Sequence, residues 1–370
     1  MISTGALWAA IGSFALATAI ASLLTPLIRQ WARRRDFVDR PGGHKTHLAP
    51  TPYGGGIAIT VAVLLPIVAV LAVAALLRHA DPQHIRLLTG PMPAWPYWIG
   101  GVVQKMPAAL AVVAGALIMH LMGILDDHWP LSPLLKLTVQ TTVALMLTAG
   151  FGVRAGEALG PAPAVVLTTL WIVGLTNAFN FLDNMDGLAA GVAALTAIVL
   201  ALAALMAGQV FVPCLLLLVA GAAAGFLRYN FPPASVFMGD AGSLVLGYLL
   251  AVATVLTTYY DPHQQRTPFG VLVPLVVFAV PIYDITSVVF NRYRRGASIF
   301  QSDHHHFSHR LVRLGYSRRA AVLTLYLATA ATARPALRRP LLNWPGAAVV
   351  VGQCACVVAL IAVLESRNGP

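Results

Sequence analysis

Long apolar runs separated by short polar stretches make up most of the chain. A helix that crosses a bilayer needs about 20 mostly apolar residues, and eleven runs approach that length, the tenth being the shortest. The predicted spans cover residues 5–28, 54–77, 107–125, 134–151, 162–179, 187–207, 209–227, 242–259, 268–290, 319–333 and 344–364. The pattern predicts an all-α, polytopic membrane protein with about eleven transmembrane helices, or ten if the tenth run is not a span.

The polar stretches between these spans are too short to form a separate soluble domain. The longest cover residues 29–53, 78–106 and 291–318. We therefore predict a single transmembrane domain over residues 1–370. Its inner loops are expected at about residues 29–53, 126–133, 180–187, 228–241 and 291–318.

The amino-acid composition supports the membrane prediction and excludes other classes of protein. Of the 370 residues, 58% are hydrophobic and 10% are charged, whereas soluble domains carry roughly 25% charged residues. Such a chain lacks the polar side chains to cover a globule in water, so a soluble enzyme and a disordered protein are both excluded. The three cysteines lie in apolar runs, which supports neither a disulfide framework nor a zinc site.

The charge that remains is mostly basic, with 24 Lys and Arg against 13 Asp and Glu. Arginines follow the first apolar run and none precedes it, which is not the order of a cleaved signal peptide, so we expect the N-terminus to face outward. Sixteen of the 24 basic residues then fall on the inner side, as the positive-inside rule requires. The basic excess therefore reflects membrane topology, and nucleic-acid binding is not expected.

The few acids gather on the same inner side. Asp126 and Asp127 end the third predicted span, Asp183 and Asp186 lie between the fifth and the sixth, and Asp240 opens the eighth. Carboxylates at membrane depth are costly and usually functional. We expect these dispersed segments to build one site, an active-site cleft on the cytoplasmic face.

The first acidic motif is DDHWPLSPLLKL, residues 126–137. Adjacent carboxylates repel each other, so Asp126 and Asp127 need a cation or a shared proton. Ser132 and Pro133 predict a helix start, which places Lys136 in the first turn, near the acids. The alternative is that two acids at a helix end are simply solvated beside a surface lysine.

The second motif is NAFNFLDNMDGLAAG, residues 177–191. Its Asn177, Asn180, Asp183 and Asp186 recur every three residues, which on a helix forms one stripe. The two acids could share a cation or a network of donors. The alternative is an interhelical hydrogen-bond seam.

The third motif is VFMGDAGSLVLG, residues 236–247. A glycine-rich turn before a helix presents free N–H groups to an anion, and Asp240 within it suggests a divalent cation between carboxylate and phosphate. Asn230 and Phe237 offer amide donors and a stacking ring nearby. The alternative is an ordinary capped helix start.

Two basic inner loops suit a phosphate. The later one reads SDHHHFSHRLVRLG, residues 302–315, and its candidate residues are His304, His305, His306, His309 and Arg310. We favour phosphate or sugar contact over metal binding there, because the acids elsewhere are hard oxygen ligands that suit Mg²⁺ or Mn²⁺. The earlier loop carries Lys45 ahead of the glycines at 54–56, with lipid-headgroup contact as the alternative.

Together these motifs resemble the polyprenyl-phosphate N-acetylhexosamine-1-phosphate transferase family, glycosyltransferase family 4. The resemblance covers about residues 35–320 and includes, in family order, DD-x-x-x-LSP-x-x-KL, N-x-x-N-x-x-D-x-x-DGLA-x-G, FMGD-x-GSL-x-LG and HHHF. It implies transfer of a HexNAc 1-phosphate from a UDP-sugar to undecaprenyl or another polyprenyl phosphate, with release of UMP. It also implies the bacterial plasma membrane, the first membrane step of cell-envelope polysaccharide synthesis, and leaves a homodimer open.

The resemblance further implies roles for individual residues. Asp240 and Asp127 would bind Mg²⁺, with Mn²⁺ as a substitute, and Asp126 or Asp127 would deprotonate or position the lipid phosphate. The catalytic set adds Asp183, Asp186, His304, His305 and His306. Substrate binding is assigned to Lys45, Lys136, Asn180, Asn230, Phe237, His309 and Arg310.

Details of the loops favour one branch of this family. The segments HRL-x-R-LG and PTPYGGG look more like the UDP-GlcNAc-type initiators than the phospho-MurNAc-pentapeptide translocase, which is the alternative. Asn184 stands where the family most often has glycine, and His305, Phe307 and Ser308 mix features of both branches. The alternative of a different class is a proton-coupled secondary transporter, disfavoured because the acids gather at one face and the chain shows no internal repeat.

Overall fold

The computed structural model describes residues 3–40, 50–78, 95–257, 259, 271–296, 298, 306–341, 346, 348–356 and 359. These residues are almost all helical, as the apolar pattern predicts. The helices are α1 (Thr4–Arg34), α2 (Gly55–Leu77), α4 (Trp95–His128), α5 (Pro133–Leu145), η1 (Met146–Gly150), η2 (Glu157–Leu159), α6 (Pro161–Leu182), α7 (Leu188–Met206), α8 (Phe211–Asn230), α9 (Asp240–Leu256), α10 (Val273–Val277), α11 (Ala279–Arg294), α12 (Phe307–Arg313), α13 (Arg318–Ala333) and η4 (Arg334–Leu341). Strands β1 (Val38–Asp39) and β2 (Thr51–Pro52) form a short antiparallel hairpin.

Seven helices within the described ranges are long and apolar enough to cross a membrane. Three other predicted spans are helical but shorter or interrupted. Helix α5 has 13 residues before it continues as η1, α9 has 17, and the span expected at 268–290 is divided at Phe278 into α10 and α11. Of the span expected at 344–364, only residues 346, 348–356 and 359 are described, so the total of eleven stays a prediction.

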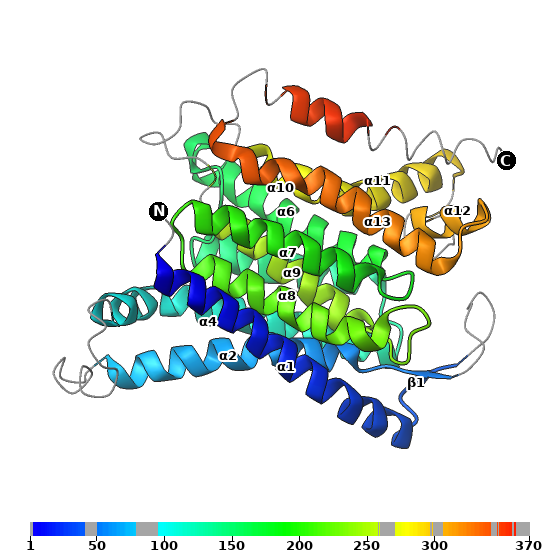
Figure 1. Cartoon of the computed structure of the whole chain (residues 1–370), viewed down its shortest axis with the longest axis horizontal. Helices are drawn as coiled ribbons and strands as arrows, with labels where there is room; N and C mark the ends of the chain where they lie inside the picture. The colour runs from blue at the N-terminus through cyan, green and yellow to red at the C-terminus, as the bar shows by residue number, and fades with distance from the viewer. Residues whose placement is uncertain are drawn as a thin grey trace.

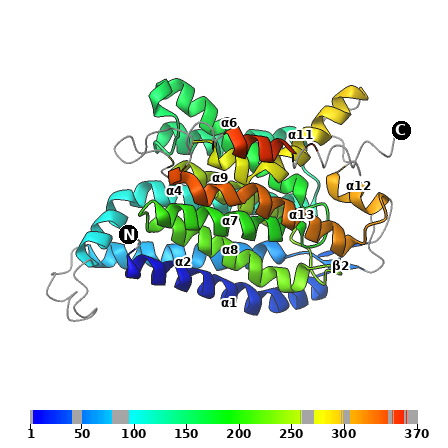
Figure 2. The ribbon, with the colours of Figure 1, turned by 45° about the horizontal axis from the view of Figure 1, so that its top comes forward.

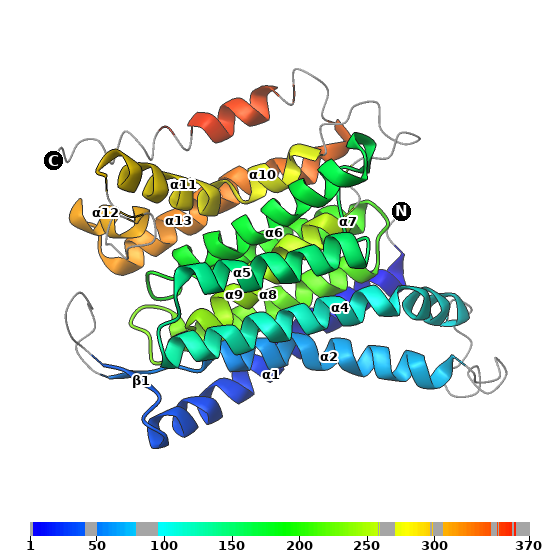
Figure 3. The ribbon, with the colours of Figure 1, turned by 180° about the vertical axis from the view of Figure 1, so that it is seen from behind.

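Helix α9 forms the core of the bundle. Its residues from Ala241 to Thr254 are all buried, and it packs against α2, α4, α6, α7 and α8 (Figure 3). Helix α1 is its opposite, because Trp8 and Leu23 are 67% and 70% exposed on the outside of the bundle. A membrane bundle is expected to contain both kinds of apolar helix: helices enclosed by others, such as α9, and helices with apolar side chains on the outside, such as α1.

The motif-bearing segments meet at one end of the bundle, as expected. Helices α4, α6 and α8 end there and α5, α7 and α9 begin there, beside the β hairpin and α12, while α1 begins at the opposite end (Figures 1 and 2). Several helices extend into the expected loops, since α1 reaches Arg34 and α11 reaches Arg294. Helix α12 also lies within the stretch expected to be a loop at 291–318.

Candidate active site

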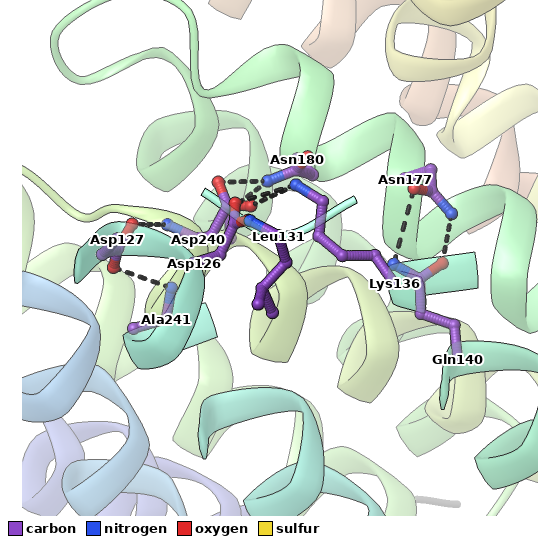
Figure 4. Close-up of polar contacts among 10 residues, drawn as sticks. Asp126, Asp127, Leu131, Lys136, Gln140, Asn177, Asn180, Asp240 and Ala241 are labelled. Carbon is purple, nitrogen blue, oxygen red and sulfur yellow. Dashed lines mark hydrogen bonds and ion pairs between the residues drawn. The ribbon is translucent and has the colours of Figure 1, made fainter. Parts of the chain in front are cut away.

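The end of α4 holds the start of α9 through one carboxylate. Asp127 Oδ1 accepts the backbone N–H of Asp240 at 2.7 Å, and Asp127 Oδ2 accepts that of Ala241 at 3.2 Å (Figure 4). The N–H groups of Gly242 and Ser243 are bonded to the carbonyl of Gly239. The expectation that this helix start offers free N–H groups to an anion is therefore wrong, because the protein supplies its own anion there.

Glycines allow this close approach of backbones. A Cβ at Gly123, one turn before Asp127 on α4, would lie 2.4 Å from the backbone of Asp240 and Ala241. A Cβ at Gly56 would lie 2.3 Å from the nitrogen of Gly242. The Gly54–Gly56 triplet, expected from sequence to adjoin a phosphate or headgroup contact, thus packs the start of α2 against the start of α9.

Lys136 joins two of the acids. Ser132 Oγ accepts the N–H of Leu135, which confirms the predicted start of α5. Lys136 Nζ then lies 2.8 Å from Asp126 Oδ2 and 3.1 Å from Asp240 Oδ2 (Figure 4). The lysine side chain is 22% exposed, so this bridge is partly screened from water and its electrostatic attraction is stronger than that of a surface pair. Lys136 thus links the first and third motifs, although it lies 104 residues before Asp240 in the chain.

Asn180 completes the contacts of Asp240. Its Nδ2 donates to Asp240 Oδ1 at 2.7 Å and lies 3.1 Å from Ser243 Oγ. One turn earlier on α6, the amide of Asn177 pairs with that of Gln140 on α5 (Figure 4). The predicted polar stripe is therefore present for Asn177 and Asn180. The Asn177–Gln140 pair is also an interhelical hydrogen-bond seam, which was the alternative interpretation of this motif.

The stripe does not continue to the acids, because α6 ends at Leu182. Asp183 and Asp186 lie in the turn Asp183–Gly187, called the acid turn below. Burial, reinforced by the charges of Asp240, Asp127 and Asp186, raises the pKa of Asp183 well above its usual range, although the N–H of Gly239 donates to this carboxyl. Asp186 Oδ2 instead accepts the N–H of Ala234 at 2.9 Å.

Asn230 anchors the same turn from α8. Its Oδ1 accepts the N–H of Gly187 at 2.9 Å, and its Nδ2 donates to the carbonyl of Val236 at 3.0 Å. The residue is buried. Both polar ends of its amide are thus engaged inside the protein, an arrangement that fixes the loop before α9 and does not present the amide to a nucleobase.

Phe237 lies between the hairpin and α9. Its N–H donates to the carbonyl of Pro52 at 2.9 Å, its carbonyl accepts the N–H of Gly55 at 3.0 Å, and its ring centroid lies 6.2 Å from that of Tyr53. Burial and the charge of Asp39 raise the pKa of Tyr53 far above its usual range. The ring of Phe237 is therefore placed by β2, in a mixed aromatic and acidic surrounding.

The histidine-rich loop is described from His306 onward. His306 Nδ1 lies 3.0 Å from Asp284 Oδ2 on α11, and Arg310 Nη2 lies 2.9 Å from Ser287 Oγ. The ring centroid of His309 lies 6.5 Å from that of His306. Lys45, His304 and His305, also expected at the site, lie outside the described residues.

Several residues that organise this end were missed from the sequence. Gly123 and Ser243 looked like ordinary helix residues, and their close contacts exist only because α4, α6 and α9 meet. Asp284 did carry a signal, since it is a carboxylate within a predicted span. Asn184 and Ser308 carried another, since both are in places where the chain departs from the resembled family.

The oxygen ligands gathered here are chemically suited to a magnesium ion. The carboxylates of Asp126, Asp127, Asp183 and Asp240, called the carboxylate cluster below, come together here. Asp126 and Asp240 bind the ammonium of Lys136, Asp127 binds the backbone N–H of Asp240, and the charges of Asp127 and Asp240 act on Asp183. Carboxylate oxygens are the ligands Mg²⁺ prefers, and four carboxylates leave excess negative charge. No group of three or more His, Cys, Asp or Glu side chains is arranged to hold a metal ion in the part of the chain that is described; the side chain of Lys136 instead bridges Asp126 and Asp240.

Comparisons with known proteins agree with the motifs. This chain is 33% identical over 314 residues to the probable undecaprenyl-phosphate N-acetylglucosaminyl 1-phosphate transferase of Bacillus subtilis, a match that covers 82% of this chain and 78% of that protein. It is 34% identical over 376 residues to the decaprenyl-phosphate N-acetylglucosaminephosphotransferase of Mycobacterium tuberculosis, covering 94% and 86%. It is 25% identical over 317 residues to the undecaprenyl-phosphate alpha-N-acetylglucosaminyl 1-phosphate transferase of Escherichia coli, covering 82% and 76%.

A family model matches as well. The model of glycosyl transferase family 4 matches residues 109–258, the stretch that contains the first three motifs. The same stretch supplies all four aspartates of the carboxylate cluster, together with Lys136 and Asn180. The chain therefore belongs to glycosyl transferase family 4.

Proposed function

We propose that this protein transfers N-acetylglucosamine 1-phosphate from UDP-GlcNAc to a polyprenyl phosphate, releasing UMP. The observation that carries the proposal is the convergence of Asp126, Asp127 and Asp240 with Lys136 and Asn180 at one end of a membrane bundle. The relatives named above act on undecaprenyl or decaprenyl phosphate and carry N-acetylglucosamine in their names. Family membership favours this reaction over a proton-coupled transporter, and the relatives' names favour it over pentapeptide transfer.

The reaction is a direct displacement at phosphorus. An oxygen of the lipid phosphate attacks the β-phosphorus of the UDP-sugar, a new P–O bond forms, and the bond to UMP breaks. Asp126 and Lys136 are the pair we assign to the lipid phosphate, because Lys136 supplies a cation and the Asp126 carboxylate can accept a proton. Asp127 has both oxygens bonded to backbone N–H groups, so it also holds Asp240 in place. The alternative route is attack by an aspartate through a covalent phospho-enzyme.

Magnesium dependence is part of the proposal. Asp240 and Asp127 would hold the ion, with Mn²⁺ as a substitute. The bound cation would neutralise charge on the pyrophosphate. Asn180 orients the Asp240 carboxylate through Asp240 Oδ1, and Lys136 binds Oδ2, so both oxygens of Asp240 are oriented by neighbouring side chains before any ligand binds.

The remaining expected residues divide into two groups. Phe237 is assigned to stacking on uracil and Asn230 to holding the loop that carries Phe237. Lys45, His304, His305, His306, His309 and Arg310 are assigned to phosphate or sugar contact. The site is assigned to the cytoplasmic side of the bacterial plasma membrane, because most basic residues lie at that end and soluble nucleotide sugars are found there.

One assay tests this function. Detergent-solubilised protein is incubated with undecaprenyl phosphate, Mg²⁺ and UDP-GlcNAc radiolabelled in the sugar, and label in the lipid phase and free UMP are measured together. We expect equal amounts of both products and none from Asp240→Asn, which should still insert and fold. Activity only with UDP-MurNAc-pentapeptide, or no UMP from any UDP-HexNAc, would contradict the proposal.

A further inference from the structure

The residues His306–Arg313, called the His segment below, are held by a buried carboxylate on α11. Asp284 is 1% exposed. Its Oδ2 lies 3.0 Å from His306 Nδ1, and its Oδ1 accepts the backbone N–H of Phe307 at 2.9 Å. A single carboxylate therefore binds the imidazole and caps the start of α12.

A second contact ties the His segment to the acid turn. The buried hydroxyl of Ser308 donates to Oδ1 of Asn184, the residue directly after Asp183. Nδ2 of Asn184 donates to the carbonyl of Phe181 at 2.6 Å. Both polar ends of this amide are engaged, so its orientation is fixed. The side chain that replaces the usual glycine thus has a specific partner in the His segment.

The ring of Phe181 packs against the imidazole of His306. Its centroid lies 5.9 Å from that of His306 with the planes nearly perpendicular, and the guanidinium of Arg292 lies 5.5 Å from the same ring. The imidazole is thereby confined by an aromatic ring as well as at Nδ1. Such confinement limits the ring to one orientation.

We propose that Asp284 and Asn184 are positioning residues that dock the His segment on the acid turn for binding of the sugar diphosphate. Asp284 selects the tautomer of His306 with the proton on Nδ1, because a carboxylate facing a ring nitrogen requires a donor there. Nε2 is then the nitrogen left for a ligand. Asn184, through Ser308, sets the separation between the His segment and Asp183. This inference rests on the proposed function of the carboxylate cluster.

The first test is Asp284→Asn. The asparagine keeps an oxygen for the N–H of Phe307 but presents an amide donor to His306 Nδ1, which forces the proton to Nε2. We expect kcat/KM for UDP-GlcNAc to fall about 10- to 100-fold, and the ¹⁵N signals of His306, assigned by comparison with His306→Gln, to change tautomer. Thr286→Ala is the matched control, since its hydroxyl bonds only carbonyls of its own helix.

The tautomer of His306 can be measured without turnover, so this measurement separates the positioning role of Asp284 from the proposed function. If wild-type protein releases no UMP but His306 changes tautomer in Asp284→Asn, the proposed function fails and the positioning by Asp284 stands. If the wild type is active and Asp284→Asn keeps both its kcat/KM within about twofold and its tautomer, the positioning role is wrong. A merely structural Asp284 would lower thermal stability without moving the tautomer of the folded protein.

The second test is a double-mutant cycle of Asn184→Ala and Ser308→Ala, which does not depend on the Asp284 variant folding. Loss of one hydrogen bond should raise KM for UDP-GlcNAc about fivefold while kcat changes less, and KM for the lipid should stay the same. Because Asn184→Ala already removes the contact with Ser308, the double variant should be no worse than Asn184→Ala alone. Multiplying effects would show that the two residues act independently and would overturn the docking contact.

Discussion

The end of α4 and the acid turn each present two aspartates, and within each pair the carboxylates have different partners. On α4, Asp126 bonds Lys136, whereas Asp127 bonds two backbone N–H groups of α9. In the acid turn, the charges of Asp240 and Asp127 help to raise the pKa of Asp183, whereas Asp186 accepts the N–H of Ala234. In both regions one acid interacts with charged side chains and the other accepts backbone N–H groups and fixes the chain beside it.

The two regions differ in how firmly they are built. The α4 pair lies on the last turn of a long helix, so its geometry is set by α4 and by contacts with α5 and the start of α9. The acid turn has no helix of its own and is held by α8 through Asn230, by α12 through Ser308 and by α13, whose Tyr326 hydroxyl donates to the carbonyl of Gly187 at 2.5 Å. We therefore expect activity to depend on the charge of the α4 pair, and to depend, for the acid turn, on the contacts that α8, α12 and α13 make with it.

Among the acids of these two regions, the largest expected effect is that of Asp126→Asn. The variant removes the charge partner of Lys136 but keeps an oxygen for the N–H of Leu131, so the fold should persist. We expect kcat/KM to fall roughly 10³-fold, as when a preorganised charge is removed from an active site, with little change in melting temperature. The control is Asp36→Asn, which breaks an exposed pair with Arg40. A loss of activity under tenfold would show that the charge of Asp126 is not used.

Asp127→Asn should be less damaging to turnover but more damaging to stability. One atom of the amide must then face a backbone N–H of α9 as a second donor, which leaves that N–H unsatisfied at a cost of about 1–3 kcal/mol. We expect a lower melting temperature in detergent and a roughly 10²-fold loss of activity. A variant as stable as the wild type would contradict the assignment of Asp127 to the backbone of α9.

The raised pKa of Asp183 predicts a pH dependence of cation binding. A carboxyl with a raised pKa keeps its proton to higher pH, and a metal ion binds only the deprotonated form, so binding must release that proton. The Mg²⁺ concentration for half-maximal activity should therefore fall as pH rises from 6 to 8, by up to about tenfold per pH unit for one proton. Asp183→Asn should flatten this slope. A wild-type slope of zero would place Asp183 away from the cation.

The sequence predicts those features of the fold and the site that depend on neighbouring residues, and fails for those that depend on contacts between distant segments. The apolar runs, the start of α5 at Ser132 and the proximity of Lys136 to Asp126 follow from helix periodicity and capping, and all are present. The inner loop expected at about 180–187 agrees with the end of α6 at Leu182, but the polar stripe was wrong for Asp183 and Asp186. Residues spaced by three continue the helical pattern into a turn that tertiary contacts impose. The free helix start at Asp240 was also wrong, since the acid that occupies it lies 113 residues earlier in the chain.

The smallest expected effect is that of Asp186→Asn, and it bears most directly on the comparison. The amide oxygen can still accept the N–H of Ala234, so we expect kcat/KM to fall by less than about fivefold, the worth of part of one hydrogen bond. Asp186→Ala removes the acceptor altogether and should cost more, in both activity and melting temperature. If Asp186→Asn instead loses as much activity as Asp183→Asn, its charge takes part in the reaction. In that case both carboxylates of the acid turn act through their charge, whereas at the end of α4 Asp127 acts through the backbone of α9.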